Sequence, residues 1–310
     1  MQRKPKAAVL LSTYNGERYL KEQVDSILSQ KGVDVELYVR DDGSHDQTLE
    51  ILRSYKRKNI HIASDGENLG PGMSFMKLLY IVGRRRDADF YAFADQDDIW
   101  LEDKLSKAVS MILDEHTPLL YCSNQTLYED GEETGLRFRE EPDLTLAHHI
   151  HKNELSGCTM VLNSALAKCI TDTRCPGKDI LDYRMHDAWI FLVALIQGQV
   201  VYDPDSSILY RIHGNNTVGV KEKSITQRLA RLMGLGKEGR GYRNVRQKSA
   251  RLLLREYPEM REDDRAFLEL FSNYRDSLRQ RLALATSREA IERSNEKRAG
   301  FILKVFLGLV

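Results

Sequence analysis

The first hundred residues alternate between short apolar runs and polar segments with helical spacing. Residues 7–12 form a continuous apolar run, which is typical of a buried parallel strand. Further strands are predicted near residues 34–40, 60–63 and 89–94, and helices near 17–30, 46–58 and 73–83. This alternation predicts an α/β fold with a doubly wound, mainly parallel sheet and helices on both of its faces.

The alternation loosens after residue 100. We predict a helix near 101–115, strands near 118–127 and 155–162, a helix from about His186, and strand-like pieces at 199–203 and 207–212. Later segments read as helices, at 223–234, 242–256, 261–284 and 287–309. We therefore expect a sheet-containing domain over residues 1–220 and a helical C-terminal region over residues 221–310.

The charge distribution separates the same two regions. The 310 residues carry no formal net charge, but residues 1–220 contain 25 Lys and Arg against 34 Asp and Glu, whereas residues 221–310 contain 21 against 12. The basic helices are either a solvated face or a surface for anionic lipid head groups or a lipid-linked acceptor. The apolar segment Phe301–Val310 favours membrane contact or packing in a homo-oligomer. No nucleic-acid-binding motif accompanies the charge, so we expect no nucleic acid partner.

The rest of the composition is that of an ordinary globular protein. Hydrophobic residues make up 42% and charged residues 30% of the chain. The apolar run near the N-terminus is too short for a signal peptide, and no run reaches the length of a membrane-spanning helix. The four cysteines lack the spacing of a zinc site. We therefore expect reduced cysteines and a cytoplasmic location.

Three polar clusters follow predicted strands: Ser12–Asn15, Asp41–Ser44 and Asp95–Asp98. In doubly wound sheets, ligands bind beyond the carboxyl ends of the strands, near the point where the strand order reverses. This placement indicates a ligand site assembled from the three clusters.

The acidic cluster has two interpretations. Asp95, Asp97 and Asp98 repel one another unless a cation or hydrogen-bond donors compensate their charge, and carboxylate oxygens suit Mg²⁺ or Mn²⁺. The same acids could instead form a turn that caps the following helix. Asp41 and Asp42 pose a similar choice between a helix-capping turn and hydrogen bonds to a nucleotide.

Two further residues are candidates from the second half of the chain. Asp187 lies in the segment Met185–Trp189 before an apolar helix, where it could cap the helix or act as a general base. His213 follows a strand-like run, and a lone histidine of this kind is more often structural than a ligand.

Together these segments resemble the inverting family 2 glycosyltransferases of GT-A fold. The resemblance covers about residues 7–217 and rests on seven segments in family order: LLSTYNGERYLKEQVDSILSQ, LYVRDDGSHDQT, ENLGPGMSFMKLL, FYAFADQDDIWLEDKL, LSGCTMVLNSAL, MHDAWIFLVALIQG and YRIHGNNT. It implies a GT-A type sheet followed by a helical region, a nucleotide-sugar donor, and a saccharide or lipid-linked acceptor.

The resemblance also implies a role for each candidate residue. Ser12, Thr13 and Tyr14 would line the nucleotide pocket, and Asp41 or Asp42 would meet the base. Asp95 would face the ribose or the outer shell of the metal. Asp97, with His213 closing the site in some members, would hold Mg²⁺ or Mn²⁺. Asp187 would be the catalytic base.

Finer features most resemble bacterial rhamnosyltransferases that build cell-surface polysaccharides from dTDP-L-rhamnose. These features are Asp-Gln-Asp-Asp-Ile-Trp, Gly-Cys-Thr-Met, Met-His-Asp and Tyr-Arg-x-His. The Gln-x-x-Arg-Trp element of processive synthases is absent, which favours single transfers. A UDP-hexose-dependent transferase of the same fold and a non-catalytic nucleotide-sugar-binding protein remain as alternatives.

Overall fold

The computed structural model describes residues 3–114, 116–214, 236–294 and 297–310. The chain divides into two compact units. The first contains residues 1–142, 155–175 and 198–218, and the second contains residues 143–154, 176–197 and 219–310. The predicted boundary at residue 220 and the predicted helix at 223–234 lie outside the described residues, so both remain predictions.

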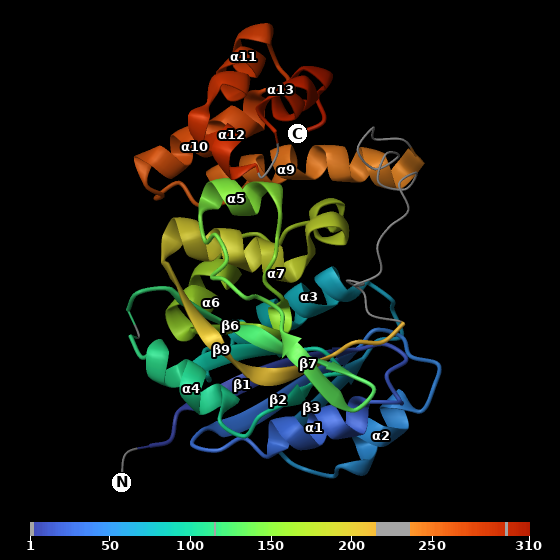
Figure 1. Ribbon diagram of the computed structural model, residues 1–310. Helices are drawn as coiled ribbons and strands as arrows, with labels where there is room; N and C mark the ends of the chain where they lie inside the picture. Colours follow the sequence, from blue (N-terminus) through green and yellow to red (C-terminus); the bar gives the residue numbers. More distant parts are fainter. Residues whose placement is uncertain (1–2, 115, 215–235, 295–296) are drawn as a thin grey trace. The chain divides into compact units, whose positions relative to one another are not determined.

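The first unit is built on one sheet (Figure 1). Its strands run in the order β3-β2-β1-β4-β8-β6-β9-β5, and β7 pairs with β6. Their bounds are β1 (Lys6–Thr13), β2 (Asp34–Asp41), β3 (Ile60–Ser64), β4 (Phe90–Ala94), β5 (Ile99–Trp100), β6 (Leu119–Glu129), β7 (Glu132–Leu136), β8 (Val161–Asn163) and β9 (Gln199–Arg211). Strands β1 to β4 are parallel, while β5, β7 and β8 add antiparallel pairs.

The strand order reverses at β1, which lies between β2 and β4. Thr13 at the end of β1 pairs with Asp41 of β2, and Leu11 of β1 pairs with Ala94 of β4. The carboxyl ends of the three strands are therefore neighbours, as the polar clusters in the sequence predicted.

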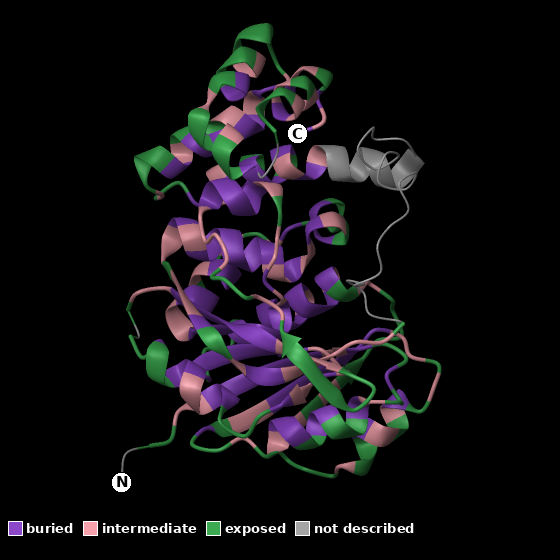
Figure 2. Ribbon diagram, viewed as in Figure 1, coloured by how far each residue is buried: buried purple, intermediate pink, exposed green. Residues whose placement is uncertain are grey.

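Helices of the first unit follow the predicted alternation. They are α1 (Leu20–Leu28), α2 (Thr48–Ser54), α3 (Pro71–Gly83), α4 (Lys104–Met111) and α6 (Ser164–Thr171). The spacing of Leu20, Val24 and Ile27 gives α1 one apolar face, and all three side chains are fully buried. Figure 2 shows the buried strands of the sheet and the exposed hairpin strand β7.

The later part of this unit departs from the predicted elements. The strand expected at 155–162 is wrong over most of its length: a 3₁₀ turn (Gly157–Thr159) precedes the short β8. The two pieces expected at 199–203 and 207–212 are one strand, β9, which pairs with β6 through shifts in register. Strands β5 and β7 and helix α6 were not predicted, because short elements and turn-rich sequence carry weak periodicity.

The second unit is helical. It contains α5 (Leu146–His151), α7 (Lys178–Gln197), α9 (Gly236–Glu256), α10 (Glu262–Asn273), α11 (Leu278–Thr286), α12 (Arg288–Arg293) and α13 (Arg298–Leu307). Each of the single helices predicted at 261–284 and 287–309 is two helices. The break after α10 has a local cause, because the hydroxyl of Ser277 accepts a hydrogen bond from the amide of Gln280 and starts α11. Among the described helices, none is both long and apolar enough to cross a bilayer.

Candidate functional site

The loops after β1 and β4 are joined by the side chain of Gln96. Its amide oxygen accepts a hydrogen bond from the backbone N–H of Tyr14 (2.8 Å), and its amide nitrogen donates to the carbonyl of Tyr14 (3.1 Å). Gly16 leaves room for this contact, since a Cβ there would lie 2.3 Å from Oε1 of Gln96. Two of the three predicted clusters therefore form one continuous surface.

The second cluster is tied to the same loop. The hydroxyl of Thr13 donates to Asp41 (3.0 Å), and the amide and hydroxyl of Ser44 also donate to this carboxylate. The backbone N–H of Asn15 in turn donates to the hydroxyl of Ser44. Asp41 is fully buried, while the side chain of Tyr14 is 46% exposed. The structure thus brings all three sequence clusters together at the switch point.

Asp42 has a different environment from its neighbour. Its carboxylate forms an ion pair with Arg40 and accepts hydrogen bonds from the amides of Leu69 (2.8 Å) and Gly70 (2.9 Å). Arg40 also donates to Ser74, whose hydroxyl is hydrogen-bonded to Ser12 (2.6 Å). Asp42 therefore holds the turn before α3 in place, and this network reaches the predicted nucleotide residue Ser12.

His213 lies next to the acidic loop, although it is more than 100 residues away in the sequence, because β9 ends beside this loop. Its Nε2 lies 2.8 Å from Oδ2 of Asp97, and both side chains remain partly exposed. The ring of His213 also packs on Tyr19, with ring centroids 5.2 Å apart. The two atoms are close enough to bind one divalent cation together, and the carboxylate is the type of ligand that Mg²⁺ and Mn²⁺ prefer.

Arg211 stabilises the acidic loop next to this pair. Its guanidinium donates to the carbonyl of Asp97 (2.9 Å), its backbone N–H donates to Asp98 (3.1 Å), and its cation lies over the ring of Tyr19. Sequence reasoning did not assign Arg211 a role, although it stands two residues before His213. Its cation offsets part of the repulsion among the acids.

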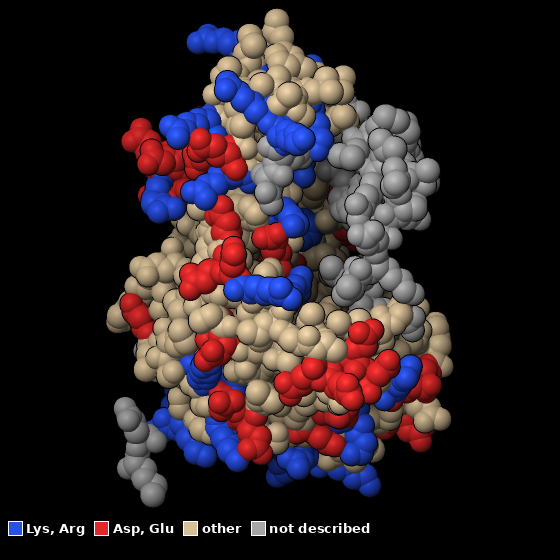
Figure 3. Space-filling model, in the orientation of Figure 1, with Lys and Arg blue, Asp and Glu red and all other residues tan. Residues whose placement is uncertain are grey.

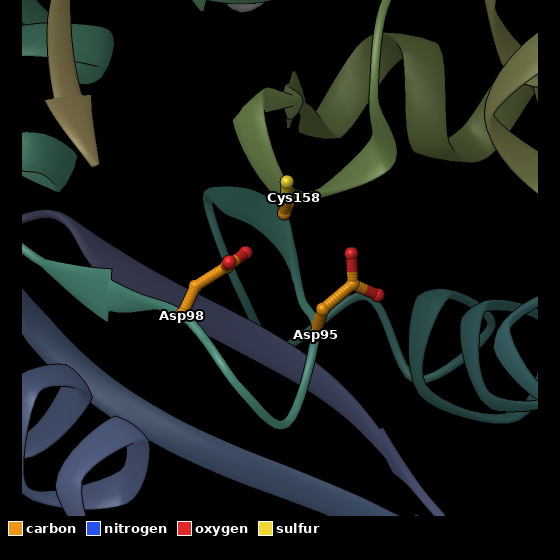
Figure 4. A group of neighbouring side chains, drawn as sticks. All are labelled: Asp95, Asp98 and Cys158. Carbon is orange, nitrogen blue, oxygen red and sulfur yellow. The ribbon is translucent and has the colours of Figure 1, made fainter. Parts of the chain in front are cut away.

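Asp95 and Asp98 face Cys158 of the 3₁₀ turn, as Figure 4 shows. One ligand atom from each of the three residues lies within 4.8 Å of the others. Burial, with the nearby charges of Asp97 and Asp95, raises the pKa of Asp98 well above its usual value. Burial and the carboxylates of Asp98 and Asp95 also raise the pKa of the Cys158 thiol. The innermost part of the acidic loop, where Asp98 meets Cys158, therefore favours protonated groups.

Lys104 is a second residue that sequence reasoning missed. Its side chain is fully buried at the start of α4, and its Nζ lies 4.9 Å from the centroid of the Trp100 ring. Burial lowers the pKa of this amine to about 8, against the opposing influence of Cys158, Asp98 and Asp203. At neutral pH it is mostly a cation behind the acidic loop. A lysine at a helix start carries no sequence signal of burial.

Asp187 belongs to the second unit, within α7. The helix begins at Lys178, earlier than the predicted start at His186, and it is interrupted at Met185. Oδ1 of Asp187 accepts a hydrogen bond from the amide of the next residue, Ala188 (2.6 Å), which is a local contact and not the bond of an N-cap to the second or third helical residue. Its role as a base toward the acidic loop of the first unit stays a prediction.

A hollow of about 740 Å³ lies elsewhere in the first unit. Asp89, Phe90 and Leu113 line it, together with Lys168 and Asp172 of the α6 region. It therefore opens at the amino end of β4 and contains none of the predicted site residues.

Acids beyond the switch point of this mixed sheet, with the histidine that follows β9 in contact with one of them, are the arrangement expected of a GT-A type glycosyltransferase. The model of the family "Glycosyl transferase family 2" matches residues 8–168, and the chain belongs to this family. The resemblance in the sequence and the fold that it implied are both confirmed.

Relatives and solved structures agree with this assignment. The dTDP-rhamnosyl transferase RfbG of Shigella flexneri is 30% identical over 67% of this chain and 73% of its own length. The UDP-Glc:alpha-D-GlcNAc-diphosphoundecaprenol beta-1,3-glucosyltransferase WfgD of Escherichia coli is 29% identical over 51% of this chain and 60% of its own length. The structure of S. aureus TarS 1–349 in complex with UDP-GlcNAc has a TM-score of 0.59 and 20% identity, covers 97% of this chain and 81% of TarS 1–349, and shares the fold.

Proposed function

We propose that this chain is an inverting, metal-dependent, non-processive glycosyltransferase in cell-surface polysaccharide synthesis. It transfers L-rhamnose from dTDP-L-rhamnose to a saccharide or lipid-linked acceptor. The observation that carries the proposal is the pairing of Asp97 with His213 at the switch point, beside the loop of Thr13 and Tyr14. The similarity to RfbG supports the rhamnosyl donor. WfgD and the TarS complex with UDP-GlcNAc favour a UDP-hexose as the second candidate donor.

The contacts of each residue support the proposed donor-binding roles. Ser12, Thr13 and Tyr14 line the nucleotide pocket. Asp41 is the better partner for the pyrimidine N3–H, because hydroxyl partners such as Thr13 and Ser44 can rotate to share a carboxylate with a ligand. Asp42 is held instead by a guanidinium and two backbone amides, which cannot turn away.

Asp97 and His213 would hold the divalent cation, and Asp95 would face the ribose or the outer shell of the metal. Mn²⁺ or Mg²⁺ bound here supplies positive charge that offsets the charge building on the departing nucleoside diphosphate. A mannosyltransferase from Pyrobaculum calidifontis in complex with GDP-Man and Mn²⁺, with a TM-score of 0.50 and 14% identity, shares the fold. Arg211 would help to keep the acidic loop folded, because its guanidinium donates to the carbonyl of Asp97 and offsets part of the charge of the loop.

Asp187 takes the proton of the acceptor hydroxyl as its oxygen forms the bond to the anomeric carbon. The bond from that carbon to the diphosphate breaks on the opposite face, which inverts the configuration. A single displacement of this kind needs one base and no nucleophile from the protein.

The second unit is proposed to contact the cytoplasmic face of the membrane. Leu278 and Leu282 of α11, and Leu303 and Leu307 of α13, are between 48% and 65% exposed. Phe301, Val305 and Val310 are buried, so only part of the predicted apolar end is available for such a contact. The two helices touch, because Arg281 donates to the carbonyl of Phe306 (2.8 Å).

Charge favours a lipid surface over a second copy of the chain. Arg279, Lys297 and Arg298 are exposed on the same helices or at their ends, and Figure 3 shows Lys and Arg side chains over this region. A symmetric dimer through this face would oppose like charges, whereas anionic lipids complement them. The four free cysteines agree with a cytoplasmic location.

Vesicle binding tests the membrane contact. Leu303→Glu with Leu307→Glu should reduce sedimentation with phosphatidylglycerol-containing vesicles, and Leu113→Glu in the first unit is the control, since Leu113 is 61% exposed. Equal vesicle binding of the two variants would show that these leucines do not contact the membrane. A change only in the sedimentation coefficient of the protein without lipid would instead assign them to a contact between copies of the chain.

The donor is tested by thermal stabilisation. A ligand that binds only the folded protein raises the melting temperature by mass action. We expect dTDP-L-rhamnose with Mn²⁺ to give the largest shift among dTDP-, UDP- and GDP-sugars, and chelation by EDTA to remove it. A larger shift with a UDP-hexose would select the second donor. Stabilisation without any sugar transfer or donor hydrolysis would indicate a non-catalytic binding protein.

A further inference from the structure

The backbone of α7 is strained immediately before Asp187. Met185 has φ 64° and ψ 168°, a combination that is essentially restricted to glycine. A side chain persists in this region only when the surrounding structure over-determines it. Two buried neighbours in the sequence, Arg184 and His186, hold Met185 in this conformation.

Arg184 anchors the strained residue on its N-terminal side. Its guanidinium is buried and donates to the carbonyls of His149 (2.9 Å) and Ile150 (2.6 Å) at the C-terminal end of α5. These carbonyls belong to the last turn of α5, where a helix has no internal donors left and where cations are favoured. Arg184 therefore cannot move without leaving buried carbonyls unpaired.

The C-terminal side of Met185 is fixed by the core. His186 is buried, and burial lowers the pKa of its imidazole to about 3, so the ring is neutral at physiological pH. The next turn, Ala188–Phe191, is almost completely buried, and the ring of Phe191 packs on His149 of α5 (4.0 Å between centroids). Asp187 thus lies between a buried histidine and a rigid helix.

We propose that Arg184 is a positioning residue that, through the left-handed Met185, fixes the direction of the Asp187 carboxylate. The inference rests on the proposed role of Asp187 as the base. Helix α5 supplies the fixed point, Arg184 connects α7 to it, and the strained peptide turns the chain so that Asp187 is only partly buried while His186 beside it faces the core. A relaxed helical path through residue 185 would rotate the two side chains away from these places.

The chain offers a matched control. Arg246 of α9 donates to the carbonyl of His151 (3.0 Å), at the same end of α5. Arg246→Met removes a guanidinium from the same helix end but leaves Arg184, the residue next to Met185, in place. A purely stabilising role of the buried cations would make Arg184→Met and Arg246→Met behave alike.

Hydrogen exchange tests the positioning without any substrate. In Arg184→Met we expect the amides of residues 186–190 to exchange about 10-fold faster or more, because local opening becomes easier. Arg246→Met should leave these amides at the wild-type rate. Equal exchange in the two variants overturns the proposal. If Arg184→Met does not fold, Arg184→Lys, which keeps the charge but not the two-pronged contact with both carbonyls, takes its place, with a smaller acceleration expected at the same amides.

Turnover gives the second readout. With dTDP-L-rhamnose and Mn²⁺, Arg184→Met should lower kcat about 10- to 100-fold with little change in the donor KM, as expected for a displaced base. Arg184→Lys should recover part of the loss, and Arg246→Met should retain wild-type kcat. A normal kcat in Arg184→Met, when Asp187→Asn is inactive, overturns the positioning role. A normal kcat in Asp187→Asn removes the base assignment itself, while hydrogen exchange still decides the positioning.

Discussion

The two units hold their candidate residues in different ways. In the first unit, the acidic loop is fixed by side-chain hydrogen bonds among loops far apart in sequence, through Gln96, Ser44 and Arg211. In the second unit, Asp187 follows a strained peptide held by one buried cation, Arg184. The first design assembles a polar surface that many residues share. The second makes the direction of one carboxylate depend on a few backbone angles.

The largest expected effect is the loss of Asp97. Asp97→Ala removes a proposed metal ligand, and we expect kcat/KM to fall about 10³-fold or more, in line with the several kcal/mol that a cation contributes to charge stabilisation. Mn²⁺ titration followed by calorimetry should show weaker binding in the presence of the nucleotide. The melting temperature should change little, because the lost contact with His213 is offset by removal of an acid whose charge acts on the buried Asp98. Asp103→Asn, at an exposed position before α4, is the matched control.

Asp187→Asn should separate the two units by their functions. The amide keeps the shape of the side chain but accepts no proton, so we expect kcat to fall about 10²- to 10⁴-fold. Binding of the nucleotide sugar, measured by calorimetry, should stay within about 2-fold, in contrast to Asp97→Ala. Asp182→Asn, on the exposed side of the same helix, should behave as wild type. Loss of donor affinity in Asp187→Asn would give this residue a binding role instead.

Acid should destabilise the second unit through His149. Burial and the charge of His148 lower the pKa of its ring to about 4 from 6.5. Between these values the unfolded chain binds more protons than the folded one, so the free energy of unfolding falls as the pH drops through this window. The contribution at pH 5 is about 2 kcal/mol relative to pH 7. His149→Phe should reduce this dependence in urea unfolding, and the remainder comes from His151 and His186, whose pKa values are also lowered by burial. His116→Gln, at an exposed site in the first unit, should leave it unchanged.

The sequence predicted the first unit better because its signals are local. An apolar run that ends in polar residues marks both the strand and the position of the candidate site, which is why Thr13, Asp41 and the acids were found together. The strained conformation of Met185 has no sequence signature, since methionine is an ordinary helix former. The burial of Arg184 and Lys104 likewise depends on tertiary neighbours, and isolated Arg and Lys residues are usually exposed. The breaks at Ser277 and Ser287 could have been found from the capping preference of serine.

The smallest effect is expected from Gln96, and this variant tests whether several hydrogen bonds, rather than one, fix the loops of the first unit. Gln96→Ala removes both hydrogen bonds to the backbone of Tyr14 but leaves Thr13, Ser44 and Asn15 in their own contacts. We expect the donor KM to rise about 5- to 10-fold with kcat nearly unchanged, because about 1 kcal/mol of loop ordering must come from the bound nucleotide. Gln125→Ala, a change of the same size within the sheet, separates loss of the loop contact from general destabilisation. A fall in kcat comparable to that of Asp97→Ala would mean that the acidic loop depends on the single residue Gln96, just as Asp187 is proposed to depend on Arg184. The contrast between the two units would then disappear.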